Sequence, residues 1–170
     1  NIVDSHDARR QLRQIFRAVL TDSSADYVEI SRQLTACGWL SSHYYLCLFL
    51  KTEQMDYKNL THRSICSYIE NMVPASCAVT HKGNIVAYIN LDLCHLSESE
   101  IEQKLAGFIR DSFLTAGYSR KMLGHFNFHR QYVQASLSMG VGSRKHPHQW
   151  IHHFNDIALT YLLEQTTKKL

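Results

Sequence analysis

The stretch HYYLCLFLK, residues 43–51, limits the folds open to this chain more than any other segment. It is a continuous apolar run rich in aromatic residues. Its length is typical of a strand rather than a helix, and a run without polar alternation is typical of a strand in the interior of a sheet. The sequence therefore predicts a buried central strand at 43–51.

Residues 80–92, THKGNIVAYINLD, predict a β-hairpin, because apolar runs flank Gly83-Asn84. We expect a three-residue loop, 82–84, that places His81 opposite Ile85. That register gathers one apolar face: Cys77, Val79, Ile85, Ala87 and Ile89. A two-residue Gly-Asn loop is the alternative, and it separates the faces less cleanly.

Helical periodicity surrounds these strands and predicts helices at 7–21, 25–37, 57–73, 97–114 and 127–139, and a last one from Asp156. Ser97 and Glu100 form a capping box. Further boundary signals are Ser23 and Ser24 as caps, Pro74 after the third helix, and Gly38 and Gly140 as stops. Short strands are expected at 116–122 and 150–154.

This order of elements predicts an α+β fold, with helices packed on a mostly antiparallel sheet. Its βαββα core is of the kind found in ferredoxin-like and nucleotide-cyclase sheets. A length of 170 residues suits one domain with an appendage. We place an N-terminal helical segment for linkage or dimerisation at 1–40 and the main domain at 41–170.

Bulk composition gives no support to several functional classes. The net charge of +3 is too small to imply nucleic-acid or membrane binding. No apolar run approaches the roughly 20 residues of a membrane span, and no signal peptide is evident. The five cysteines form no CxxC pair, which favours reduced thiols in a cytoplasm. Because the chain begins with Asn, we expect it to be a fragment of a longer protein.

Four histidines close to one another, His146, His148, His152 and His153, invite interpretation as a metal site. The last two point to opposite faces of a strand, so at most three could converge, and no acidic ligand is adjacent. A polar loop running into a half-exposed strand is the favoured interpretation.

Two other patterns carry no predicted chemistry. The acidic run of Asp92, Glu98, Glu100 and Glu102 is explained by a helix N-terminus. GVGS, residues 140–143, lacks the preceding strand and following helix of a phosphate loop. We predict no catalytic, metal or cofactor-binding residue in this chain.

The leading helix carries a wide apolar stripe, formed by Leu12, Ile15, Phe16, Val19 and Leu20. Such a stripe must be buried, either on its own domain or against the same helix of a second copy in a homodimer. Arg10, Arg13 and Arg17 lie on the other side. A solvated face is favoured over a DNA-binding helix, because these arginines are few.

The second half resembles the GGDEF-like domain of the CdaR/PucR family of bacterial transcription regulators. The resemblance lies in Gly117-Tyr118-Ser119, in Tyr132 with Ala135, and in FNDIAL, residues 154–159. The front half, EISRQLTACGWLSSHYYLCLFL, resembles the helix–Gly–strand entry of that family. Arg130 and Gln131 depart from the pattern where a Ser before the Tyr is common.

The resemblance implies a fold related to diguanylate cyclases, used as a regulatory module between a sensor region and a C-terminal helix-turn-helix. An active cyclase carries an acid in the hairpin turn and a metal-binding Asp on its first strand. The turn here is His81-Lys82-Gly83-Asn84, and the strand at 44–50 is apolar.

We therefore expect a non-catalytic regulatory domain of a cytoplasmic bacterial transcription regulator, with no cofactor and no membrane partner. DNA would be bound only through a helix-turn-helix outside this chain, and the sequence does not name a small-molecule effector. The alternatives are a divergent nucleotide cyclase and a small-molecule sensor in its own right.

Overall fold

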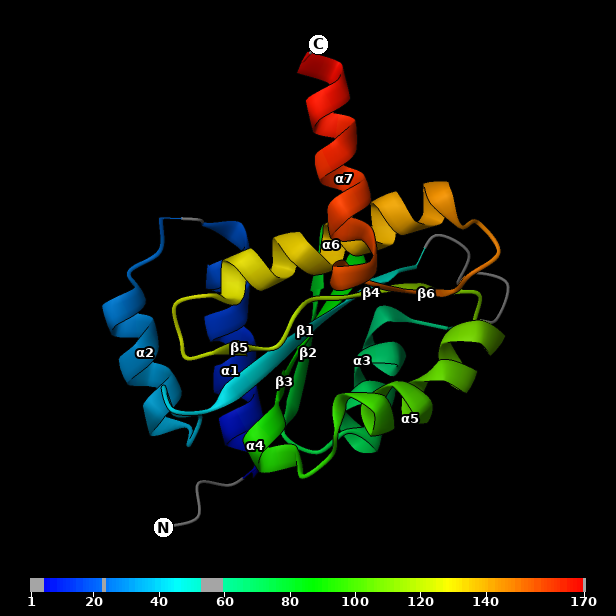
Figure 1. Ribbon diagram of the computed structural model, residues 1–170. Helices are drawn as coiled ribbons and strands as arrows, with labels where there is room; N and C mark the ends of the chain where they lie inside the picture. The colour runs from blue at the N-terminus through cyan, green and yellow to red at the C-terminus, as the bar shows by residue number, and fades with distance from the viewer. Residues whose placement is uncertain (1–4, 23, 53–59, 170) are drawn as a thin grey trace.

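The computed structural model describes residues 5–22, 24–52 and 60–169 (Figure 1). Within them lie seven helices and a six-stranded sheet, an α+β arrangement as expected. The helices are α1 (Ser5–Thr21), α2 (Tyr27–Ala36), α3 (His62–Met72), α4 (Leu91–Cys94), α5 (Glu98–Asp111), α6 (Phe128–Lys145) and α7 (Phe154–Lys169). The strands are β1 (Tyr44–Lys51), β2 (Ser76–His81), β3 (Asn84–Asn90), β4 (Thr115–Tyr118), β5 (Met122–Leu123) and β6 (Ile151–His153).

The sheet is mostly antiparallel, with strand order β2-β3-β1-β4-β6 and β5 paired to β1. Only the β4–β6 pair is parallel among the described strands. Strand β3 lies between β1 and β2 and is antiparallel to both. Helix α3, which connects β1 to β2, therefore crosses over β3. No helix in the described part of the chain is long and apolar enough to cross a bilayer.

Strand β1 is buried on both faces, as its apolar run predicts. Tyr45, Cys47 and Phe49 face a cluster built with α1, α2 and α6. Leu46, Leu48 and Leu50 face a cluster built with α3 and α5. Helices therefore cover both sides of the sheet, which leaves no solvent-facing side along most of this strand.

The hairpin register expected from the sequence is wrong by one residue. The loop has two residues, Lys82-Gly83, both with positive φ (49° and 80°), and His81 pairs with Asn84. Two positive φ values mark a type I′ turn, whose twist suits a hairpin. The expected single face is divided: Cys77 and Val79 face α1 and α6, whereas Ile85, Ala87 and Ile89 face α3 and α5. Because both faces are apolar, the hydrophobic pattern could not select the register.

The expected stop of α6 at Gly140 is also wrong. The helix continues to Lys145, so GVGS is helical and not a loop. A glycine inside a helix costs only about 1 kcal/mol relative to alanine. Burial of Val141 and Gly142 against the core outweighs that cost.

Other boundaries moved by a few residues. Helix α2 is capped by Asp26 rather than Ser24, while Ser23 lies outside the described residues. Helix α3 begins after a Thr61 cap, and residues 57–59 of its expected start are outside the described part. Helix α7 starts at Phe154, which places Asp156 in its first turn, and the strand expected at 116–122 is divided into β4 and β5.

Two boundary signals are confirmed. Ser97 and Glu100 form the capping box that opens α5. Gly38 follows α2 with a φ of 84°, the left-handed conformation that glycine adopts without strain.

Candidate functional site

The hairpin turn is held in place by neighbouring elements. The carbonyl of Gly83 accepts hydrogen bonds from Thr52 Oγ1 at 2.8 Å and His62 Nε2 at 2.7 Å. The Asn84 Oδ1 accepts from the Thr52 backbone at 3.2 Å. Polar groups of the turn are thus used to fix the end of β1 and the start of α3.

His81, at the start of the turn, points away from it toward α6. Its ring lies edge-on to that of Tyr132, with centroids 5.4 Å apart. Burial, then Lys82 and His129, lower the pKa of His81 below its usual range. The side chain is therefore neutral at pH 7, and its position is that of a core residue.

Neither the turn nor β1 contributes a carboxylate. Residues 81–84 contain no acid, and β1 has no acid from Tyr44 to Lys51. The nearby Asp92 accepts a hydrogen bond from the Tyr44 backbone at 2.6 Å. Across residues 5–22, 24–52 and 60–169, no three His, Cys, Asp or Glu side chains lie close enough together to hold a metal ion.

The predicted histidine group is dispersed. His152 is buried with its ring against Gly142 of α6, and burial lowers its pKa. His153 turns the other way, with Nε2 2.8 Å from Glu102 and Nδ1 3.6 Å from Asp156. His146 and His148 are exposed in the preceding loop. The two strand histidines thus point to opposite faces, as expected.

The apolar stripe of α1 is packed on its own sheet. Leu12, Ile15, Phe16, Val19 and Leu20 are each at most 5% exposed. Phe16 lies at the centre of the packing, with ring centroids 4.4 Å from Tyr88, 5.2 Å from Phe128 and 5.5 Å from Trp39. The stripe is therefore buried on its own domain, which was the first of the two expected alternatives.

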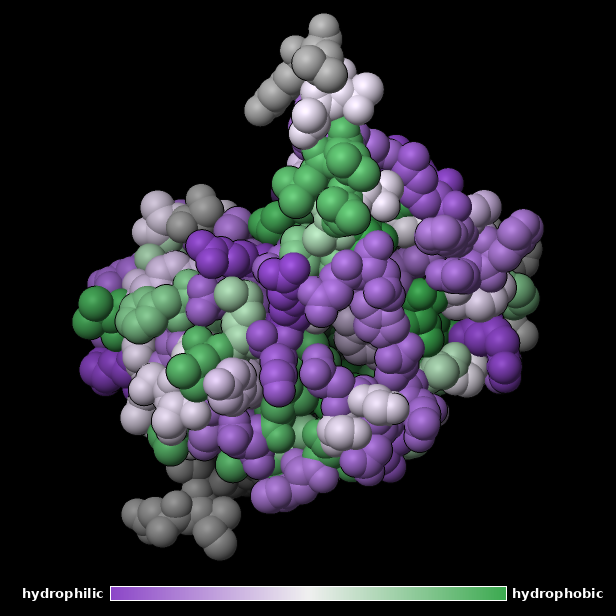
Figure 2. Space-filling view, viewed as in Figure 1, coloured by the Kyte–Doolittle hydropathy of each residue, from purple (hydrophilic) through white to green (hydrophobic). Residues whose placement is uncertain are grey.

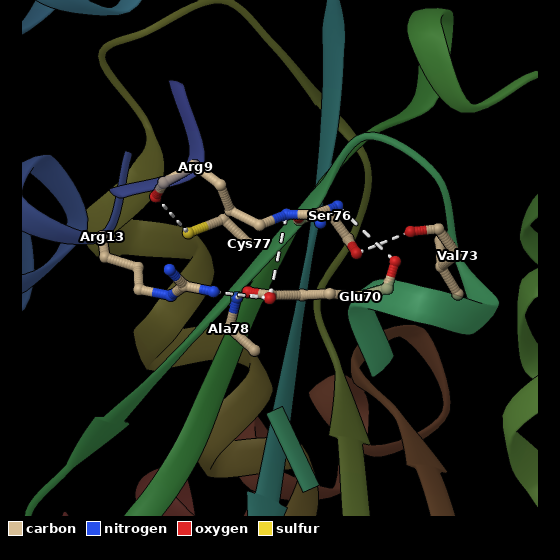
Figure 3. Close-up of polar contacts among 7 residues, drawn as sticks. All are labelled: Arg9, Arg13, Glu70, Val73, Ser76, Cys77 and Ala78. Carbon is tan, nitrogen blue, oxygen red and sulfur yellow. Dashed lines mark hydrogen bonds and ion pairs between the residues drawn. The ribbon is translucent and has the colours of Figure 1, made fainter. Parts of the chain in front are cut away.

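Beside this stripe, Arg9 and Arg13 join α1 to α3 at the edge strand β2 through Glu70 (Figure 3). The Glu70 side chain is 5% exposed and pairs with Arg13 at 2.6 Å and Arg9 at 3.8 Å. It also accepts the backbone N–H of Ala78 at 2.9 Å, while Arg9 Nε donates to the Ser76 carbonyl at 3.1 Å. These side chains therefore replace a neighbouring strand along part of the β2 edge.

A cavity of about 580 Å³ opens beside this network, between α1, α3 and β2. Its charged lining consists of Arg9, Arg13, Arg17, Arg63 and Glu70. Sequence reasoning missed this cavity, although Arg9, Arg13 and Arg17 recur at four-residue spacing and so share one helical face. Glu70 and Arg63 lie in another helix, and nothing in the sequence pairs them with α1.

The cysteines offer no nucleophile. Cys47, Cys66, Cys77 and Cys94 are buried free thiols, and Cys37 is half-buried. Cys66 faces the arginine-lined cavity, yet burial and Glu70 raise its pKa to about 11 against the opposing effect of Arg13 and Arg17. A thiol of that pKa is protonated at neutral pH and reacts slowly.

Helix α7 projects from the body of the molecule, with its C-terminal end farthest away (Figure 1). Three of its leucines are more than half exposed: Leu159, Leu162 and Leu163. Figure 2 shows apolar side chains gathered along this projecting helix. Arg144 and Lys145 of α6 bind Glu164 at 3.5 and 2.7 Å, which ties the middle of α7 to α6.

Comparison with known proteins gives a structural match but no sequence match. No protein-family model matches the chain, and no curated protein matches it significantly. The chain is similar to the crystal structure of a regulator of polyketide synthase expression from Bifidobacterium adolescentis, with a TM-score of 0.54 and 11% identity. The match covers 80% of this chain and 54% of that one, so this chain spans about half the length of that regulator.

Proposed function

We propose that this chain is a non-catalytic regulatory domain of a bacterial transcription regulator, acting in the cytoplasm. It would pass a signal to a DNA-binding helix-turn-helix outside the chain. The observation that carries the proposal is the hairpin turn, which lacks an acid and whose Gly83 carbonyl is taken by Thr52 and His62. Phosphoryl transfer needs Mg²⁺ to neutralise developing charge, and neither 81–84 nor 44–50 contains a carboxylate to hold it.

The fold supports the same proposal. The run β1–α3–β2–β3–α5, with β3 between β1 and β2, has the split arrangement of the βαββα core in cyclase-like sheets. The structural similarity to a regulator of polyketide synthase expression links this arrangement to gene regulation. We infer a degenerate GGDEF-like domain, in which the cyclase fold is kept as a scaffold.

Helix α1 is our candidate for coupling to a sensor. Helix α1 packs Phe16 into the sheet, while Arg9 and Arg13 at the border of the same buried side bind Glu70 of α3. A shift of α1 would therefore move both the sheet face and α3, which is a known way of transmitting a signal. A homodimer remains part of the proposal, and its contact would lie away from the buried stripe of α1.

The alternative is a divergent nucleotide cyclase, and calorimetric titration of GTP with and without Mg²⁺ separates the two. We expect Mg²⁺ not to strengthen nucleotide binding, because no carboxylate is placed on the turn or β1. Mg²⁺-dependent GTP binding that disappears when Lys82 and Asn84 are both replaced by alanine would favour the cyclase.

The DNA-binding half of the proposal has its own test. This chain alone should shift DNA only weakly and without sequence preference at physiological salt, because the basic residues of its sequence are scattered and form no recognition-helix pattern. A mobility-shift assay with specific and scrambled competitor DNA measures this. Sequence-specific retention would place the DNA reader inside the chain and contradict the proposal.

A further inference from the structure

We propose that the cavity between α1, α3 and the edge of β2 binds a small molecule through an oxyanion, either a phosphate or a carboxylate. This cavity is distinct from the hairpin turn, and the inference does not depend on the regulatory role. It makes the domain itself a receptor for an anionic metabolite.

The charge of the cavity is the first argument. Four arginines, Arg9, Arg13, Arg17 and Arg63, face a single carboxylate, Glu70, which leaves an excess of three positive charges. Arg9 and Arg13 are engaged by Glu70. Within the described residues, Arg17 and Arg63 have no carboxylate at ion-pair distance, so both guanidinium groups are available to an anion.

The edge of β2 is the second argument. Cys77, Val79 and His81 direct their backbone groups toward β3, because the two-residue loop makes 81 and 84 a hydrogen-bonded pair. The alternate residues therefore direct theirs outward. Glu70 takes the N–H of Ala78, but in the described part of the chain no backbone group pairs with the Thr80 N–H. Thr80 lines the same cavity as Arg17 and Arg63.

The same geometry indicates a small molecule rather than an added strand. A peptide strand would need a run of outward backbone groups along β2. Arg9 occupies the Ser76 carbonyl and Glu70 occupies the Ala78 N–H, so the run is interrupted. What remains is one unpaired backbone donor at Thr80, in a cavity that Arg17 and Arg63 also line. Their planar guanidinium groups suit the paired oxygens of a phosphate or carboxylate.

The size of the cavity indicates that the oxyanion is part of a larger molecule. A volume of about 580 Å³ falls within the range of small-molecule sites and exceeds what one phosphate needs. The lining beyond the arginines includes Cys66 and Val79, which offer apolar contact to the body of such a ligand.

Inorganic phosphate and malonate serve as probes in separate titrations, with chloride keeping the ionic strength constant. Binding to the native chain is followed by calorimetry and by the rise in unfolding temperature, since a ligand of the native state stabilises it. The test variant is Arg17→Gln with Arg63→Gln. The matched control is Arg10→Gln with Arg32→Gln, which removes two surface charges outside the cavity.

We expect saturable binding of at least one probe, weakened about tenfold or more in the cavity variant and unchanged in the control. A response to phosphate alone identifies a phosphorylated ligand, and a response to malonate alone a carboxylate. Circular dichroism verifies that each variant is folded, and the single variants Arg17→Gln and Arg63→Gln replace the double variant if it is not. Absence of saturable binding by both probes, equal binding by the cavity variant, or equal weakening in the control would overturn the proposal.

Discussion

At the scale of single residues, Glu70 is a buried polar side chain whose removal should lower stability substantially. It holds Arg13 and the Ala78 N–H while being only 5% exposed. Glu70→Ala would leave a backbone donor and a guanidinium unpaired, which should lower the free energy of unfolding by about 2–4 kcal/mol. Urea denaturation of Glu70→Ala measures this.

Glu29→Ala is the matched control, because Glu29 also binds an arginine, Arg32, but on the exposed surface of α2. Exposed ion pairs contribute little to stability, so this variant should unfold at nearly the wild-type urea concentration. Equal effects of the two substitutions would show that the Glu70 network is not a stabilising element.

Buried histidines should make the fold sensitive to mild acid. His81, His125 and His152 are each at most 8% exposed, and burial lowers their pKa below the ordinary value of 6.5. As pH falls below 6.5, these histidines become protonated in the unfolded chain but stay neutral in the folded chain. The free energy of unfolding should therefore decrease between pH 7 and pH 5, before most carboxylates titrate.

Urea unfolding at pH 7 and pH 5 measures that decrease. His152→Gln should reduce the loss of stability on acidification, whereas His148→Gln, at an exposed position, should leave it unchanged. Stability that is flat or that rises toward pH 5 would contradict the assignment of neutral buried histidines.

Individual residues were only partly predictable from the sequence. The capping pair Ser97 and Glu100 could be predicted, because the cap uses contacts between residues only three positions apart. The cavity was not, since Arg17 and Arg63 lie on separate helices and are brought together only by the packing of α1 and α3 at the β2 edge. Periodicity shows which side chains share a helical face but not which helix that face meets.

At the scale of elements, two glycines of α6 offer a matched pair. A Cβ on Gly142 would lie 2.3 Å from the His152 ring, whereas a Cβ on Gly140 would meet nothing within 4 Å. Gly142→Ala should therefore lower the unfolding free energy by about 1–3 kcal/mol through overpacking.

Gly140→Ala should instead raise the unfolding free energy by roughly 0.5–1 kcal/mol, because alanine is the better helix former. Thermal and urea unfolding of the two variants give the comparison. Destabilisation by Gly140→Ala would indicate that α6 ends near residue 140, as its sequence first indicated, and does not continue to Lys145.

The attachment of α1 can be tested at Phe16. Phe16→Glu would place a charge among the aromatic rings of Trp39, Tyr88 and Phe128, so the variant should fail to fold. Phe126→Glu is the control, because Phe126 is 63% exposed. Circular dichroism and light scattering distinguish the outcomes. A folded, monomeric Phe16→Glu protein from a dimeric wild type would assign the stripe to an interface between copies.

Local sequence pattern predicted the helices and strands far better than it predicted how the strands pair. The run at 43–51 predicted β1 because length and composition act within one segment. The hairpin register failed because Cys77 and Ile85 are both apolar although they lie on opposite faces. Alternation specifies register only when one face is polar, and helices cover both faces of this sheet.

At the scale of the whole molecule, the fold could be predicted from the sequence, but the fold does not determine the chemistry. The α+β layout was predictable, since the order of strands and helices permits few topologies. The layout is similar to that of a regulator of polyketide synthase expression, at only 11% sequence identity. Similarity at that level of identity supports a shared fold but does not establish a shared function. Function must be argued from the sites, and here they are an acid-free turn and an arginine-lined cavity.

Nucleotide turnover is the most direct test of the proposed non-catalytic role of this domain. The chain is incubated with GTP or ATP and Mg²⁺, beside an active diguanylate cyclase as positive control, and products are separated by chromatography. We expect no product above the buffer blank, because residues 81–84 and 44–50 provide no carboxylate to hold Mg²⁺. Turnover that is abolished when residues 81–84 are replaced would contradict a non-catalytic regulatory domain.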